Sequence, residues 1–181
     1  MTTRSSSGFT LIELLIVVAI IGIIAAIAVP GLLRARIAGN EASAIGSMRV
    51  INSSNLNWMT NCASGRGYAD GLDDLGIPPA GGGQPFISPD LSSSGTISKS
   101  GYEITYAALG AAITGLSTCS TVTAATPFYE AYAAPAAANT TGVRYFGTNE
   151  NQTLYEDADS SPAPVTFNAT TRVVTNGTAV R

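Results

Sequence analysis

The sequence predicts an α+β protein in which one long N-terminal helix packs against a four-stranded antiparallel sheet. Two observations support this fold class. An apolar block near the N-terminus continues into a segment with helical periodicity, and short runs in the C-terminal part alternate between apolar and polar residues. The 181 residues are enough for one modest domain plus an extension.

The chain opens with a short polar leader and a membrane-length apolar segment. The leader, residues 1–8, holds one basic residue, Arg4. The apolar run from Leu14 to Leu33 would measure about 30 Å as a helix, close to the thickness of a bilayer's hydrocarbon core. Three interpretations are open: a plain transmembrane anchor, a secretory signal cleaved after the A-x-A-like site at 26–28, and a membrane-stored subunit whose helix later packs against copies of itself.

Glu13 favours the third interpretation. A carboxylate at the start of an apolar helix is costly in lipid, and a plain anchor or signal gains nothing from it. Cleavage after Gly8 would expose the amino group of Phe9 one helical turn away, in the same subunit or in a neighbour. Opposite charges attract strongly in a dry bundle, so such a pair would set the register of assembly. The alternative is a lone glutamate that reaches the headgroups.

Residues 8–30, GFTLIELLIVVAIIGIIAAIAVP, resemble the class III signal of type IV pilins and type II secretion pseudopilins without interruption. The resemblance implies a pilin-like fold, cleavage between Gly8 and Phe9 by a prepilin peptidase, and N-methylation of Phe9. It also implies that Glu13 neutralises the N-terminus of a neighbouring subunit during assembly. Cleavage by the ordinary signal peptidase then becomes the second interpretation.

The same resemblance implies partners and a location. The partners are copies of this chain, the prepilin peptidase, an inner-membrane platform protein and, indirectly, an assembly ATPase. The precursor is expected in the inner membrane and the assembled filament on the cell surface, where it would serve adhesion, motility or DNA uptake. A pseudopilin that forms a periplasmic piston is the alternative within the family. The alternative from another class is an anchored or secreted binding domain that does not polymerise.

Two residues inside the apolar half of the helix, residues 9–33, work against regular helical structure. Pro30 removes a hydrogen bond and crowds the preceding turn, and Gly22 adds backbone freedom. The helix could bend or unwind between them, as in the filaments of similar pilins. A modest static kink fits the sequence equally well.

The helical pattern continues through residues 34–60 as an amphipathic half. Glu41 and Asn55 intrude on its apolar side. Arg34 and Arg36 would favour a cytoplasmic end under the positive-inside rule, whereas the pilin-like orientation needs the opposite side. We resolve this in favour of the pilin-like orientation because the leader is very short and carries Arg4 beside the precursor's amino group. The apolar stripe itself comprises Ile37, Ala44, Met48, Ile51, Trp58 and Met59.

The remainder, residues 61–181, predicts a globular head. Residues 61–100 are punctuated by Gly, Pro and Ser and predict an irregular connection with one short helical turn at Leu72–Leu75. Residues 101–181 predict the sheet, because apolar and polar residues alternate there. The first expected strand begins at Tyr102. The other three span Phe128–Ala133, Val143–Thr148 and Gln152–Glu156. The tail could add an edge strand, at Val165–Phe167 or Arg172–Thr175.

Two cysteines, Cys62 and Cys119, predict one disulfide in an exported chain, with two unpaired thiols as the alternative. The chain has no histidine, the commonest general base and metal ligand, so we expect no enzyme and no cofactor. The nine basic residues form no cluster, so we expect no nucleic-acid partner. We also expect no metal site. Glu156, Asp157 and Asp159 are the better of two acidic clusters, and solvated acidic turns are the favoured interpretation of both.

Overall fold

The computed structural model describes residues 8–113, 115–116, 118–119, 124–158 and 165–180. The chain divides into two compact units, Met1–Arg36 and Ile37–Arg181. Helix α1 runs from Leu11 to Cys62 and contains Pro30. The sequence predicted a helix from residue 9 to residue 60, so its ends lie within two residues of those observed.

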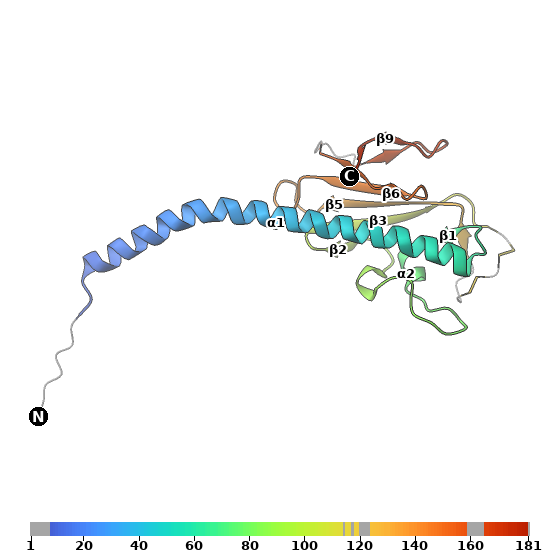
Figure 1. The fold of residues 1–181 in the computed structure, drawn as a ribbon, viewed down its shortest axis with the longest axis horizontal. Coiled ribbons are helices and arrows are strands. Elements are labelled where there is room, and N and C mark those ends of the chain that lie inside the picture. The colour runs from blue at the N-terminus through green and yellow to red at the C-terminus, as the bar shows by residue number, and fades with distance from the viewer. Residues whose placement is uncertain (1–7, 114, 117, 120–123, 159–164, 181) are drawn as a thin grey trace, which may run out of the picture. The chain divides into compact units, whose positions relative to one another are not determined.

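The head is built on a six-stranded sheet in the order β10-β7-β6-β5-β3-β2, in which every neighbouring pair is antiparallel. The second half of α1 runs alongside this sheet (Figure 1). The strands are β2 (Ile97–Lys99), β3 (Tyr102–Leu109), β5 (Phe128–Pro135), β6 (Tyr145–Asn149), β7 (Tyr155–Asp157) and β10 (Thr178–Ala179).

The predicted count of four strands is wrong, although the α+β class is confirmed. The four central strands were expected, but β2 and β10 extend the sheet at its two edges. Each edge strand is only three or two residues long and lies in a Ser-, Thr- or Gly-rich stretch, so neither shows the alternation that marks a half-buried strand. Backbone pairing with a preformed neighbour places them in the sheet.

The tail does not supply the predicted edge strand of the main sheet from residues 165–167 or 172–175. Instead β8 (Thr166–Phe167) and β9 (Val174–Asn176) pair with each other in a separate two-stranded sheet. A further two-stranded sheet joins β1 (Tyr68–Ala69) to β4 (Ala125–Thr126). The connection between α1 and the main sheet also holds α2, at the predicted Leu72–Leu75, and a 3-10 turn at Pro89–Leu91.

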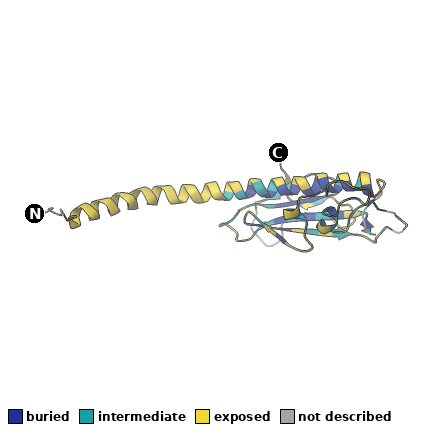
Figure 2. Ribbon diagram, turned by 90° about the horizontal axis from the view of Figure 1, so that it is seen from below, coloured by how far each residue is buried: buried dark blue, intermediate teal, exposed yellow. Residues whose placement is uncertain are grey.

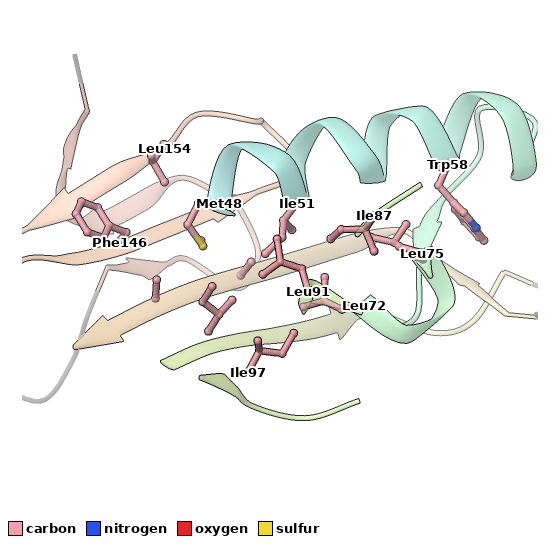
Figure 3. Close-up of a cluster of buried hydrophobic side chains, with 14 of the residues drawn as sticks. Met48, Ile51, Trp58, Leu72, Leu75, Ile87, Leu91, Ile97, Phe146 and Leu154 are labelled. Atoms are coloured by element: carbon pink, nitrogen blue, oxygen red, sulfur yellow. The ribbon is translucent and has the colours of Figure 1, made fainter. Parts of the chain in front are cut away.

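The core of the head lies between the second half of α1 and the sheet. Met48, Ile51 and Trp58 extend from α1 into this core, where Ile51 lies near Ile87 and Leu91 of the connecting segment (Figure 3). Trp58 is fully buried, as are Tyr102 and Phe146 of the sheet. The helix-facing residues of the connecting segment are Leu72, Leu75, Ile87 and Leu91.

Two polar residues that break the apolar stripe of α1 have partners in the sheet or directly before one of its strands. Glu41 accepts the backbone N–H of Val143 at 3.0 Å and forms an ion pair with Arg144 at 2.8 Å. Arg144 also pairs with Glu156 at 2.6 Å. Asn55 accepts a hydrogen bond from the hydroxyl of Tyr106 at 3.1 Å. A polar residue is stable in such a position because its hydrogen bonds are made within the protein.

One arginine ties the C-terminal ribbon of β8 and β9 to the main sheet. The side chain of Arg172 is only 10% exposed and forms ion pairs with Glu130 at 2.5 Å and Glu150 at 2.9 Å. Its guanidinium lies 5.5 Å from the centre of the Phe128 ring. The side-chain amide of Asn149 donates to the backbone carbonyl of Arg172 at 2.8 Å. The ribbon is therefore held by contacts of both the side chain and the backbone of one residue.

Cys62 and Cys119 form a disulfide that joins the last residue of α1 to the segment between β3 and β4. In the chain-entropy account, closing a loop of this length removes about 4 kcal/mol of freedom from the unfolded chain. The bond therefore anchors the C-terminal end of the helix to the head.

Candidate assembly segment

The first half of α1 exposes its apolar side chains on every side. Figure 2 shows this half as exposed, whereas one side of the second half is buried. The large apolar side chains between Leu11 and Leu33 remain 44–79% exposed. Exposed apolar surface of this extent marks a site of contact with a membrane or with other protein. By length and composition α1 is the one helix of the described residues that could cross a membrane.

The helix begins with a capping box formed by Thr10 and Glu13. The N–H and the hydroxyl of Thr10 donate to Oε2 of Glu13 at 3.0 and 2.5 Å. In return, the N–H of Glu13 donates to Oγ1 of Thr10 at 3.3 Å. This reciprocal pattern satisfies backbone donors that have no partner within the helix. Glu13 therefore has a local structural role in the uncleaved chain.

The signal for this cap, Ser/Thr-x-x-Glu ahead of an apolar run, is present in the sequence at Thr10-Leu11-Ile12-Glu13, but sequence reasoning missed it. The cap does not use the whole carboxylate. Within the described residues, Oε1 of Glu13 accepts no hydrogen bond, and the side chain is exposed.

The residues predicted at the cleavage site lie directly ahead of the helix. Gly8 and Phe9 have no helical structure, and Phe9 is 79% exposed. The rest of the predicted leader, residues 1–7, lies outside the described residues. The bond between Gly8 and Phe9 is thus accessible and belongs to no helical turn.

Gly22 and Pro30 lie inside continuous helix. A Cβ atom added to Gly22 would meet nothing within 4 Å, so packing within this chain does not require a glycine there. Because proline has no N–H, the carbonyl of Ala26 loses its usual helical donor at position 30. The helix is nevertheless continuous through both residues in the single chain. Whether it unwinds in an assembly stays a prediction.

The acidic residues weighed as metal ligands are not gathered into a site among the described residues. Glu156 is engaged by Arg144 at 2.6 Å, and Asp159 lies outside the described part of the chain. Within the described ranges, no group of three or more acidic, cysteine or histidine side chains has the geometry to hold a metal ion.

The N-terminal segment of the chain is similar to known proteins. Residues 3–29 match the prokaryotic N-terminal methylation motif. Over 38 residues, 21% of this chain, the sequence is 60% identical to the type IV wide pilus major component PilA4 of Thermus thermophilus, and the match covers 29% of that relative. No solved structure matches the chain. The motif match and the match to PilA4 confirm the prepilin-type signal recognised in residues 8–30.

Proposed function

We propose that the chain is the precursor of a type IV pilin-like subunit that polymerises through the first half of α1. The observation that supports this most strongly is the coincidence of two features in one segment. Residues 3–29 match a methylation motif, and the apolar side chains from Leu11 to Leu33 find no partner within the described chain. In a filament, copies of the chain would bury these apolar side chains against one another, away from water.

Maturation would begin at the bond between Gly8 and Phe9. A prepilin peptidase would cleave this accessible bond and methylate the new amino group of Phe9. The freed amine carries a positive charge two residues before the start of α1. Oε1 of Glu13 is then the carboxylate oxygen left to receive it, in the same subunit or in a neighbour.

Charge pairing would set the register of the stacked helices. A carboxylate moved into a dry helical bundle without a counter-charge costs several kcal/mol, whereas a paired one costs far less. Copies would therefore stop sliding along one another at the offset where each amine reaches a Glu13. Gly22 and Pro30 would provide the place where the helix adapts to that packing.

Each of three parts of the chain would have its own role in the filament. Residues 9–33 would span the inner membrane and later polymerise, residues 34–60 would support the head, and residues 61–181 would form the outward surface of the fibre. An inner-membrane platform protein and, indirectly, an assembly ATPase would transfer the subunit from membrane to filament. The cell surface would be its final location.

Mass spectrometry of the N-terminus of the mature protein tests the proposed processing. We expect the chain to begin with N-methylated Phe9. A mature chain that begins at Val29 would contradict the proposal, because it would lack the segment that is to polymerise. A chain that keeps its first eight residues would contradict it too, since no amine would be freed near Glu13.

Two substitutions separate charge pairing from helix capping. Glu13→Ala removes both, whereas Thr10→Ala removes the capping hydroxyl and leaves the carboxylate, at a cost of about 1 kcal/mol in helix stability. We expect filaments, counted by electron microscopy of the cell surface, to be lost in Glu13→Ala and kept in Thr10→Ala. Both variants should remain in the membrane fraction. Normal filaments in Glu13→Ala would show that the charge does not set assembly.

A further inference from the structure

Arg34 and Arg36 are exposed cations without a partner in the described part of the chain. They form no ion pair or side-chain hydrogen bond there. In the head, Lys99, Arg144 and Arg172 each have a carboxylate within 3 Å, whereas Arg49 and Arg66 are also exposed without an ion pair among the described residues. What distinguishes Arg34 and Arg36 is therefore their position. A guanidinium that its own chain leaves unpaired is available to an anion outside it.

The position of the pair is set by the length of the apolar segment. Between Glu13 and Arg34 the sequence contains no charged residue. At 1.5 Å per residue these two positions are about 31 Å apart along the helix axis, which matches a hydrocarbon core of about 30 Å. With Glu13 at one surface of the bilayer, Arg34 and Arg36 therefore reach the opposite headgroup layer.

The arrangement of the pair around the helix favours a surrounding partner. At about 100° per residue, positions 34 and 36 point about 200° apart, so their side chains leave the helix on nearly opposite sides. A single protein surface docked on one side of α1 would reach one arginine and miss the other. A layer of headgroups surrounds the helix and reaches both.

We propose that Arg34 and Arg36 bind the phosphate groups of phospholipid headgroups and thereby fix the depth of α1 in the bilayer before assembly. Guanidinium groups match phosphate oxygens in two-point hydrogen bonds. Phosphate is present in both leaflets, so the contact works at the non-cytoplasmic end and accounts for a basic pair at that end of the segment. This inference rests on the membrane location of the apolar segment in the proposed function.

A depth measurement on the full-length chain tests the inference. The protein is reconstituted at high lipid-to-protein ratio in phosphatidylglycerol–phosphatidylcholine vesicles, with a nitroxide on Ala38→Cys, an exposed position, and the native disulfide intact. Collision rates with oxygen and with a water-soluble nickel chelate report the depth of the label. We expect Arg34→Gln/Arg36→Gln to move the label inward by up to about one helical turn, 5.4 Å.

Matched controls show whether the effect belongs to this pair. Arg49→Gln removes an exposed, unpaired arginine of the same helix about 22 Å further along and should leave the depth unchanged. Arg34→Lys/Arg36→Lys keeps both charges and should restore most of the original depth. An unchanged depth in the glutamine double variant, or an equal shift in Arg49→Gln, would overturn the inference.

Further arms identify the anion. Excess soluble inorganic phosphate should not shift the label, and an inward shift equal to that of the double variant would assign the site to free anions and overturn the headgroup proposal. An effect of the double variant seen only at low lipid-to-protein ratio would point to carboxylates of a second copy and overturn it as well. If the glutamine double variant left the depth unchanged while filament formation still required Glu13, this inference alone would be overturned. A mature N-terminus at Val29 would overturn the proposed function itself.

Discussion

The two halves of α1 belong to one helix but differ in where their partners lie. Between Ile37 and Cys62 ten residues are buried, including Met48, Ile51 and Trp58. Between Leu11 and Leu33 no residue is buried, although this half is the more apolar. The head therefore completes its own core, and the apolar half must gain its stabilisation from lipid or from other molecules.

The buried and half-buried charges of the head differ in the same way from Arg34 and Arg36. In the head, Arg144 and Arg172 bridge carboxylates of distant segments, whereas Arg34 and Arg36 have no partner in the described chain. The paired charges of the head help to specify its own fold. Charges around the apolar half are available to the surroundings. Substitutions of matched residue types in the two regions measure this difference directly.

The largest expected contrast compares two arginines. Arg172→Ala leaves Glu130 and Glu150 largely buried without a counter-charge, which should lower the free energy of unfolding of the head by about 3–5 kcal/mol. Arg34→Ala should leave it unchanged. The measurement is urea unfolding of the full-length chain in detergent, followed by the fluorescence of Trp58, the only tryptophan and fully buried. Equal midpoints for the two variants would contradict the division of charges.

The next contrast compares two isoleucines. Ile51 is fully buried, so Ile51→Ala should cost about 3 kcal/mol through lost burial and the remaining cavity. Ile20 is 52% exposed, so Ile20→Ala should leave the unfolding of the head unchanged in the same urea experiment. A loss in Ile20→Ala comparable with that in Ile51→Ala would show that the apolar half contributes to the core after all.

The smallest expected effect concerns a carboxylate of the head that has no arginine partner. Burial, with the neighbouring carboxylates of Asp73 and Asp70, raises the pKa of Asp74 to about 6. Between about pH 4 and pH 6 the folded chain keeps a proton that the unfolded chain releases. Stability from this group is therefore present below about pH 4 and is lost as the pH rises through about 6.

Asp74→Asn removes this titration. The variant should be more stable than the parent at pH 7, by less than about 1 kcal/mol because solvent screens a partly exposed group, and no more stable near pH 4. Thermal unfolding at the two pH values measures the difference. Glu103→Gln, which removes an exposed carboxylate of β3, is the control for a general loss of negative charge. A gain of equal size in that control would refute the specific role of Asp74.

The regular elements of this fold could be predicted because their signals are local. The apolar block, the amphipathic stripe and the alternation from Tyr102 onward each lie within a few turns or one strand of sequence. The edge strands β2 and β10 could not be predicted, because two or three residues carry no periodicity. Their pairing depends on the neighbouring strand.

The polar interior was also beyond sequence reasoning. Glu41 and Asn55 could be recognised only as exceptions in the stripe, since Arg144 and Tyr106 lie far along the chain and nothing local connects them. The capping box is the opposite case. Its signal is four residues long and was available from the start. The same carboxylate therefore has a local role in the helix and an expected role between subunits.

The start of α1 has a consequence for maturation. The first helical hydrogen bond runs from the N–H of Leu14 to the carbonyl of Thr10, and the capping contacts involve only Thr10 and Glu13. Removal of residues 1–8 would break none of these bonds. Cleavage between Gly8 and Phe9, as proposed, would therefore change the charge at the N-terminal tip of α1 and leave the length of the helix unaltered.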